Sequence, residues 1–365
     1  MYKILISGYY GFNNIGDESI LKAVVDNLHE KLEGIEITVL SQNPESTSEK
    51  YKVRSKNRRS AFAIISEIKR CDLLISGGGS LLQDVTSRRS IFYYLMIMRI
   101  ALFWGKKVLI YSQGIGPISS KYNRRLTAKV LNKASGIVVR DDSSKELLKE
   151  IGVDAGRIVV TADPVLRIKP VSLDIGREIL KREGFVAVEG RLTVGYAIRE
   201  RKSDEAFIGE LCLSLERLIG EYNAQIVLIP FHFLEDMPFI EEIEKRLAGK
   251  VFAVKNKYLT EEMMSIIGNM DVLVGVRLHA LIHAAIMDVS MIAISYDPKI
   301  NSFMNSIGMK AMCSIYDFNN EFFMEEFEKT VQDGEKIKEK VQANIKKLIV
   351  KLESSEQMIK ELMEK

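Results

Sequence analysis

The chain has 365 residues, 47% of them hydrophobic and 28% charged, and its formal net charge is only +3. This length suffices for two ordinary domains, and the small net charge argues against a basic surface for nucleic acid. The three cysteines, Cys71, Cys212 and Cys313, are far apart and match no disulfide or zinc pattern, which indicates a reducing, cytoplasmic location. The first residues read as a strand, so we expect no signal peptide.

In the first half of the chain, short apolar runs alternate with helical patterns. Strands are expected at residues 3–7, 35–40, 72–76, 107–112, 136–139 and 157–160. Helices are expected between them, at about 17–32, 60–70, 90–104, 120–134 and 142–151. This alternation predicts a parallel sheet covered by helices on both faces. The most apolar stretch, 90–107, is too short to cross a membrane, so we expect a helix that is buried or lies at an interface.

The same pattern restarts after the two prolines of "ADPVLRIKP". Strands are expected near 191–200, 224–231, 250–254, 271–275 and 290–295, and helices near 204–222, 236–248, 260–268 and 278–287. We predict an α/β fold of two doubly wound Rossmann-like domains facing a cleft, where such folds bind ligands. The expected parts are an N-terminal domain at 1–168, a linker at 169–190, a C-terminal domain at 191–330 and a helical tail at 331–365.

The stretch "SGYYGFNNIGDES", residues 7–19, occupies the expected turn from the first strand to the first helix. Its spacing fits neither of the two glycine-rich nucleotide fingerprints. One interpretation is a well-capped turn, because Asn13 and Asn14 can cap the helix and Asp17 and Glu18 suit its first turn. We favour a binding or catalytic loop, because two tyrosines in a polar loop are not needed to make a turn.

A second glycine-rich stretch, "SGGGSLLQDVTSRRS" at residues 76–90, follows another expected strand. Three consecutive glycines can present backbone amides to an anion or a sugar, and Gln83, Asp84 and Arg88 supply directed polar groups. A plain flexible link is the alternative. "QGIGP", residues 113–117, follows another expected strand and is typical of an ordinary loop, with a position lining the cleft as the alternative.

The stretch "VGVRLHALIHAA", residues 274–285, places Arg277 and His279 at the start of a helix, which predicts an anion site. His279 and His283 are one turn apart, as in zinc-binding helices, but no third ligand has a useful spacing, so we expect no metal. We expect His283 to be a core residue and His279 to take part in chemistry.

Three further groups of charges are candidates. Arg140 follows a strand and is not needed to cap the next helix, so it can bind an anion. Asp297 and Lys299 follow another strand, where a proline turn with solvated charges is the alternative. Residues 50–62 contain six cations and no acid, which predicts either a solvated face or a loop that meets a polyphosphate or an anionic membrane.

Three blocks together resemble the polysaccharide pyruvyl transferases, most closely the CsaB-like branch, which modifies secondary cell-wall polymers of S-layer-bearing bacteria. The blocks are "ILISGYYGFNNIGDESIL", "SGGGSLLQDVTSRRSIFYYL" and "VGVRLHALIHAA", and the likeness covers most of residues 1–305. It implies a GT-B-like fold and transfer of the enolpyruvyl group of phosphoenolpyruvate to two hydroxyls of one sugar, giving a cyclic ketal and phosphate. The implied acceptor is a lipid-diphosphate-linked disaccharide whose N-acetylmannosamine is bridged at O4 and O6. Phosphoenolpyruvate is a co-substrate, and no cofactor is expected.

The resemblance also implies roles for individual residues. Arg140, Arg277 and Lys299 match family positions and, with Leu278, suit the phosphate and carboxylate of the donor. His279 is the expected acid, since a histidine titrates near neutral pH, and Asp17 is expected to take a proton from the acceptor. The expected acceptor-binding residues are Tyr9, Tyr10, Asn13, Asn14, Glu18, Gly78, Gly79, Gln83, Asp84 and Arg88.

A membrane-associated acceptor implies a docking surface. We expect Arg58 and Arg59, together with the apolar segment 90–104, to meet a lipid diphosphate at the inner leaflet. The expected partners are thus phosphoenolpyruvate, the lipid-linked disaccharide and, peripherally, the membrane. A homo-oligomer is compatible with the sequence, and nucleic acid is not expected.

Two other functions stay open. The first is a nucleotide-sugar glycosyltransferase or epimerase of the same fold; such enzymes usually place a carboxylate on the helix expected at 278–287, which here has no acid before Asp288. The second is a non-catalytic glycan-binding protein. The joint presence of four residues counts against it: Arg140, Arg277, His279 and Lys299.

Overall fold

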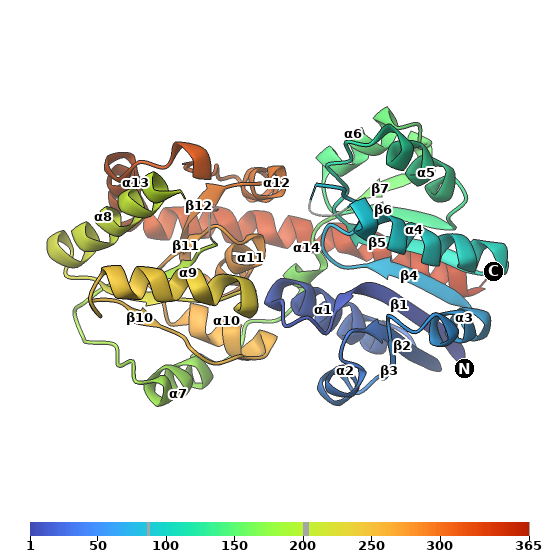
Figure 1. Ribbon diagram of the computed structural model, residues 1–365, viewed down its shortest axis with the longest axis horizontal. Helices are drawn as coiled ribbons and strands as arrows, with labels where there is room; N and C mark the ends of the chain where they lie inside the picture. The colour runs from blue at the N-terminus through green and yellow to red at the C-terminus, as the bar shows by residue number, and fades with distance from the viewer. Residues whose placement is uncertain (86–87, 200–203, 365) are drawn as a thin grey trace. The chain divides into compact units, whose positions relative to one another are not determined.

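The computed structural model describes residues 1–85, 88–199 and 204–364, and the side chains of Arg88 and Arg89 lie outside the described part. The chain divides into two compact units (Figure 1). Unit 1 comprises Met1–Arg167 and Leu348–Lys365, and unit 2 comprises Ile168–Lys347.

The described residues of unit 1 form a seven-stranded parallel sheet in the order β3-β2-β1-β4-β5-β6-β7. Most of its strands are continuous apolar runs, because helices cover both faces of the sheet. The strands are β1 (Tyr2–Tyr10), β2 (Ile35–Ser41), β3 (Arg54–Asn57), β4 (Leu73–Gly77), β5 (Lys107–Gln113), β6 (Gly136–Val139) and β7 (Ile158–Val160).

Helices pack on both faces of this sheet. Along β5, Val108 and Ile110 belong to one core with the apolar sides of α3 to α6, whereas Tyr111, on the opposite face, accepts a hydrogen bond from Asn27 of α1 at 3.1 Å. The helices are α1 (Ile15–Lys31), α2 (Pro44–Tyr51), α3 (Ala61–Arg70), α4 (Arg88–Phe103), α5 (Lys121–Leu131) and α6 (Asp142–Glu150), with 3₁₀ turns η1 (Ala155–Arg157) and η2 (Pro164–Arg167). Among the described residues, no helix is both long and apolar enough to cross a membrane.

Unit 2 repeats the design with a six-stranded parallel sheet in its described residues, in the order β10-β9-β8-β11-β12-β13. Its strands are β8 (Thr193–Ala197), β9 (Gln225–Leu228), β10 (Phe252–Ala253), β11 (Val272–Gly275), β12 (Ser290–Ser295) and β13 (Cys313–Ser314). Its helices are α7 (Leu173–Glu183), α8 (Glu205–Glu221), α9 (Phe233–Arg246), α10 (Thr260–Gly268), α11 (Leu278–Ile286), α12 (Pro298–Ser306) and α13 (Asn320–Gln332), with the 3₁₀ turn η3 (Ile315–Asp317). The expected strands and helices of both halves are thus present.

Two predicted domain boundaries were wrong. The expected linker 169–190 contains α7, which packs closely on α10: Gly176 donates its N–H to Ser265 Oγ at 2.6 Å, and a Cβ at Gly176 would lie 2.3 Å from the Ser265 backbone. The expected tail is mostly one helix, α14 (Gly334–Glu364), and it does not stand apart. Its residues from Leu348 onward belong to unit 1, where Met358 packs over Gly136.

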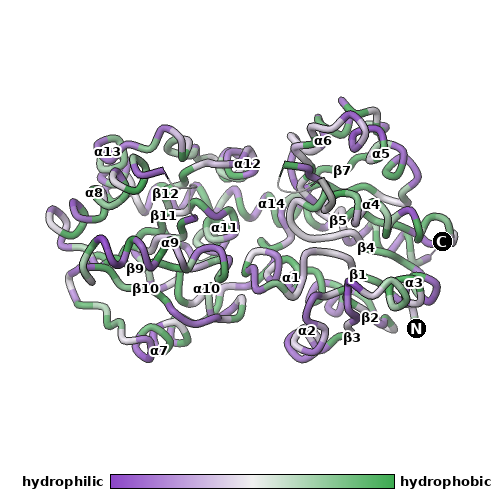
Figure 2. The backbone as a smooth tube through the Cα atoms, viewed as in Figure 1, coloured by the Kyte–Doolittle hydropathy of each residue, from purple (hydrophilic) through white to green (hydrophobic). Residues whose placement is uncertain are grey.

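The basic segment 50–62 is also more structured than expected. It includes the end of α2, which is almost entirely hydrophilic (Figure 2), all of β3 and the start of α3. β3 is an edge strand with the sequence RSKN, and a charged, short edge strand resists pairing with other chains.

Candidate functional site

The carboxyl ends of the unit 2 strands bring together a group of charged and aromatic side chains. Arg199 follows β8, His232 follows β9, Arg277 follows β11 and Tyr296 follows β12. Parallel strands end on the same edge of a sheet, and this edge is where open α/β folds bind ligands.

Two cations lie over the Tyr296 ring, and a third, Arg277, acts on its hydroxyl. The Arg199 guanidinium lies 4.6 Å from the ring centroid and the Lys299 ammonium 5.5 Å from it. Burial alone would raise the pKa of the Tyr296 hydroxyl, but Lys299, Arg277 and Arg199 outweigh burial and lower that pKa below its ordinary value. The structure thus brings together two predicted donor ligands, Arg277 and Lys299, and adds Arg199.

Arg277 is held in place by acids at the start of α9. Its guanidinium pairs closely with Asp236 and lies 3.6 Å from Glu235 Oε2. Asp236 is itself buried and accepts hydrogen bonds from the N–H groups of Phe231 and His232 at 3.0 and 2.8 Å. Burial lowers the pKa of the Arg277 guanidinium, but Asp236 more than reverses this, so the side chain stays a fixed cation.

The remaining predicted donor-side residues lie at two helix starts. Lys299 is in the first turn of α12, where its N–H donates to the capping Asp297 at 3.0 Å and its ammonium lies 3.4 Å from the same carboxylate. His279 is half-buried in the first turn of α11. Leu278 is buried, so only its backbone N–H can serve a ligand. His283 is fully buried beside the Phe231 ring, which confirms it as a core residue.

In unit 1, two glycine-rich loops meet at Asp17. Asn14 caps α1 by accepting the Gly16 N–H at 3.0 Å, which places Asp17 in the first turn. Gly79 has a φ of +53°, and a Cβ there would lie 2.6 Å from Asp17 Oδ1. Asn13, with a φ of +57°, is half-buried in the same turn. The close approach of Asp17 therefore requires glycine in the second loop.

Two predicted acceptor residues of the first loop point inward. Tyr10 is fully buried and donates its hydroxyl to Gly77 O at 2.8 Å; a Cβ at Gly78 would lie 2.7 Å from that hydroxyl. Glu18 is buried and accepts from Gly11 N at 2.8 Å and from the Tyr51 hydroxyl at 2.6 Å. Their prediction as acceptor contacts is corrected: in this structure both hold the loop in shape.

Arg58 lies beneath the first loop and not on an exposed surface. Its guanidinium donates to Gly8 O at 2.8 Å and to the Tyr94 hydroxyl at 3.1 Å, and the side chain is only 9% exposed. Four rings surround it, those of Tyr9, Phe12, Tyr93 and Tyr94. The prediction that Arg58 docks a lipid diphosphate was wrong, because the aromatic cluster encloses the charge. Arg59 next to it is exposed.

Arg58 supports an aromatic platform in the same loop. The rings of Tyr9 and Phe12 are stacked, with centroids 4.0 Å apart and an interplanar angle of 2°. Both residues are partly exposed. A flat ring face held over a buried cation is suited to stacking against a sugar ring.

The second glycine loop is anchored by its own polar residues. Asp84 is buried and accepts hydrogen bonds from the N–H groups of Ser119 and Ser120 at 2.7 and 2.9 Å and from Asn123 Nδ2 at 2.9 Å. It thus ties this loop to the start of α5, which corrects its prediction as an acceptor contact. Gln83 accepts from Val85 N at 2.9 Å, and the side chain of Arg88 lies outside the described residues.

Arg140 belongs to unit 1 and is a buried, multiply bonded cation. It pairs with Asp163 at 3.0 Å, donates to Ser80 Oγ of the second glycine loop at 3.2 Å and lies 3.4 Å from Asp141. Its guanidinium packs on Gly114, where a Cβ would approach to 2.6 Å. The "QGIGP" stretch therefore does more than make a turn, since its first glycine leaves room for Arg140.

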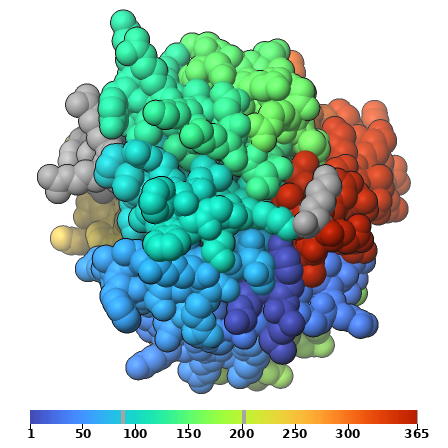
Figure 3. Space-filling model, turned by 90° about the vertical axis from the view of Figure 1, so that its right-hand side faces the viewer, coloured from blue at the N-terminus to red at the C-terminus, as the bar shows by residue number. Residues whose placement is uncertain are grey.

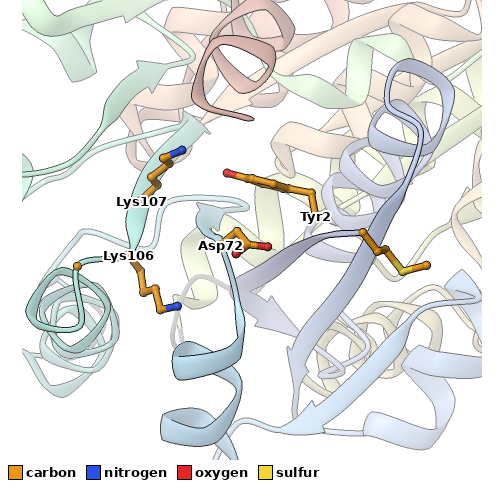
Figure 4. A pocket seen from close by; sticks show the side chains of 6 residues that line it. Tyr2, Asp72, Lys106 and Lys107 are labelled. Atoms are coloured by element: carbon orange, nitrogen blue, oxygen red, sulfur yellow. The ribbon is translucent and has the colours of Figure 1, made fainter. Parts of the chain in front are cut away.

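A hollow of about 440 Å³ lies at the other edge of the unit 1 sheet (Figure 4). Tyr2 is the first residue of β1, Lys107 starts β5, and Asp72 precedes β4. These residues and Lys106 surround the hollow, so it lies at the amino ends of the strands. It is not part of either group of loop residues described above.

Sequence reasoning missed Arg199, Tyr296 and Asp236. A signal for Arg199 was present, because it follows a buried strand at the same offset from the strand's end as Arg277 does. Asp236 gave no such signal, since its contact with Arg277 joins two helices far apart in the sequence.

Two parallel α/β units with their polar loops at the carboxyl ends of the strands define a two-domain, Rossmann-like protein of the GT-B type. The chain is similar in fold to Anabaena HepE in complex with UDP and glucose, with a TM-score of 0.66 and 11% identity over 100% of both chains. It is also similar to UDP-GlcNAc 2-epimerase from Neisseria meningitidis bound to UDP-GlcNAc, with a TM-score of 0.65 and 14% identity over 100% of both. At these identities the likeness shows the fold alone, and it confirms the predicted fold class.

The family to which the chain belongs is shown by its sequence. The model of the polysaccharide pyruvyl transferase family matches residues 14–298. The amylovoran biosynthesis protein AmsJ of Erwinia amylovora is 20% identical, over 86% of this chain and 88% of that protein. The chain belongs to the polysaccharide pyruvyl transferase family and is a pyruvyl transferase.

Replacing Arg140 tests whether its buried ion pair stabilises unit 1. Arg140→Met leaves the buried Asp163 carboxylate without its charged partner, which we expect to cost about 3–5 kcal/mol of unfolding free energy in urea. Arg177→Met, which removes an exposed pair with Asp174, is the control and should change little. Unchanged stability of Arg140→Met would show that Asp163 does not depend on this pair.

Replacing Arg199 tests the charge cluster around Tyr296. Arg199→Gln removes one of the cations that lower the Tyr296 pKa, so that pKa should rise. The measurement is the near-ultraviolet absorbance of tyrosinate across a pH titration, taken as the difference between each protein and its Tyr296→Phe counterpart. An unchanged titration of Tyr296 in Arg199→Gln would contradict the geometry described here.

Proposed function

We propose that the enzyme transfers the enolpyruvyl group of phosphoenolpyruvate to O4 and O6 of an N-acetylmannosamine residue in a lipid-linked cell-wall precursor. The products are a cyclic pyruvate ketal and phosphate. The setting we propose is CsaB-like: cytoplasmic modification of a secondary cell-wall polysaccharide that anchors an S-layer. The observation that carries the donor assignment is the convergence of Arg199, Arg277 and Lys299 on Tyr296.

Unit 2 supplies the donor side of this proposal. Phosphoenolpyruvate carries a phosphate and a carboxylate, and both groups need cations in fixed positions. Arg277 is fixed by Asp236, and Lys299 by Asp297, so neither cation has to be ordered when the donor binds. Arg140, the other expected donor ligand, belongs to unit 1; we keep it as a proposed ligand for an anionic group, with its guanidinium shared with Asp163.

Unit 1 supplies the acceptor side. Tyr9 and Phe12 offer a stacking platform for a sugar ring, and Asn13 offers an amide. Asp17 lies where the two glycine loops meet, and we assign to it the proton of an attacking hydroxyl. Tyr10, Glu18 and Asp84 are left out of this set because they are bonded inward.

The chemistry can be balanced over these groups. His279 donates a proton to C3. The C2–C3 bond becomes a single bond, C3 becomes a methyl group, and C2 becomes electrophilic. One sugar hydroxyl adds to C2 and gives its proton to Asp17; the C2–O bond to phosphate then breaks, and the second hydroxyl takes its place. Of the two protons released, one restores His279 and the other leaves with the phosphate. No redox step is required.

Phosphate release tests the proposal. We expect phosphate from phosphoenolpyruvate only when a lipid-linked or synthetic disaccharide with free O4 and O6 hydroxyls is present, and none when either hydroxyl is methylated. In parallel, UDP release from UDP-sugars tests the glycosyltransferase alternative. Release of UDP without release of phosphate would overturn the proposal; α11 carries no carboxylate, which agrees with the expected result.

Replacing Asp17 tests the division of roles. Asp17→Asn preserves the shape of the side chain but removes the base, so kcat should fall by roughly 10²–10⁴-fold while the affinity for phosphoenolpyruvate stays unchanged. Donor affinity is measured by calorimetry. Lys299→Gln is the matched comparison and should show the opposite pattern, a loss of donor affinity. A strong loss of donor binding in Asp17→Asn would contradict the assignment of Asp17 to the acceptor side.

A further inference from the structure

Helices α3 and α4 expose large apolar side chains on adjoining faces. Phe62 of α3 is 84% exposed and Phe103 of α4 is 83% exposed. The two helices pack on each other, and Lys69 of α3 lies 4.3 Å from the ring centroid of Trp104, directly after α4. We use the name docking face for the exposed side chains Phe62, Ile65 and Lys69 of α3 and Phe92, Arg99, Phe103 and Trp104 of α4 and its end.

These residues form continuous stripes. Phe62, Ile65 and Lys69 are spaced three and four residues apart, so they share one side of α3. Phe92, Arg99 and Phe103 are spaced seven and four residues apart on α4. The opposite sides of both helices are buried in the core of unit 1. The exposed aromatic residues are therefore an outward face and not an unfilled part of the core.

The surroundings of the docking face are strongly cationic. Residues 85–140 contain eleven lysines and arginines and no aspartate or glutamate; among them Arg140 is buried and Arg124 pairs with Glu150 of α6. This stretch includes α4 and α5, which pack on each other, and α5 exposes Arg125 and Lys129. Glu67, the acid within α3, is buried and pairs with Arg54 and Arg70. In Figure 3 the light blue of α3, the cyan of α4 and the blue-green of α5 adjoin on one face.

We propose that the docking face binds peripherally to the surface of an anionic lipid bilayer. Protruding aromatic rings insert at the boundary between headgroups and acyl chains, and the surrounding lysines and arginines are attracted to anionic headgroups. Tryptophan favours this interfacial position, and Trp104 lies on the docking face.

Other occupants fit the docking face less well. A second copy of the chain would bring two acid-free cationic faces together, and like charges across an interface cost several kcal/mol. Nucleic acid would use the cations, but it gives no apolar environment for Phe62 and Phe103. An anionic bilayer complements both the charge and the apolar side chains.

This inference keeps the expected apolar segment 90–104 and the expected membrane contact, replaces Arg58 with residues of α3, and does not depend on the transferase chemistry. Arg58 takes no part, since it is buried, whereas α3, which was not among the expected docking residues, contributes Phe62 and Lys69. Binding to vesicles is measured without substrate. A failure of the membrane inference can therefore be told apart from a failure of the proposed reaction.

The test is co-sedimentation of the full chain with vesicles. Vesicles of phosphatidylcholine alone are compared with vesicles that also contain phosphatidylglycerol, at low and high salt. We expect binding to the anionic vesicles that weakens with salt. The variants Phe62→Ser/Phe103→Ser and Lys69→Gln/Arg99→Gln should each lower the partition coefficient roughly tenfold or more, the first by removing inserted rings and the second by removing charge.

A matched control comes from the exposed part of α14. Val350→Ser/Lys351→Gln removes one exposed apolar and one exposed basic side chain away from the docking face and should bind as the unchanged protein does. Thermal unfolding confirms that each variant is folded. Equal binding by both vesicle types, no binding at all, or unaltered binding by both docking-face variants overturns the inference. So does a dimer in sedimentation velocity that Phe62→Ser/Phe103→Ser converts to a monomer.

Discussion

Because the strands in each unit are parallel, the unit can gather its functional side chains at only one edge of its sheet. All carboxyl ends of a parallel sheet fall on one edge, so the loops that follow them must share a small space. In unit 1 this crowding is relieved by glycine: Gly79 lets Asp17 approach the second loop, and Gly114 makes room for Arg140. In unit 2 the same constraint gathers Arg199, Arg277 and Tyr296 from three strands.

Each unit contains arginines with little exposure to solvent, but the partners of these arginines differ. Arg277 pairs with Asp236 and Arg140 with Asp163, so each is fixed by a carboxylate that is itself buried. Arg58 has no carboxylate partner in the described contacts; it donates hydrogen bonds to a backbone carbonyl and a tyrosine hydroxyl and lies against four aromatic rings. Ion pairs of this kind are costly to break from one side. A variant that removes any of these arginines therefore changes the shape of a loop as well as its charge, and activity alone cannot separate the two effects.

Much of the fold could be predicted from sequence, because buried parallel strands are short apolar runs bounded by loops. The failures have physical reasons. α7 carries local helix signals, a capping Ser172 and a left-handed Gly184 at its end, but its packing on α10, which makes it part of unit 2, is not visible in the local sequence. Likewise, Tyr9 and Tyr10 looked equivalent, yet neighbouring residues of a strand point to opposite faces, and only Tyr9 stacks in the loop.

The net charge of a sequence segment does not show whether its cationic side chains are exposed or buried. The six cations of residues 50–62 suggested one basic surface, but Arg58 is enclosed by rings contributed from β1, the first loop and α4. The absence of acids between residues 85 and 140 is a better guide, since α4 and α5 must leave one side in solvent and any charge there is positive. The exposed rings of α4 therefore have only cations as charged neighbours within α4 and α5 themselves.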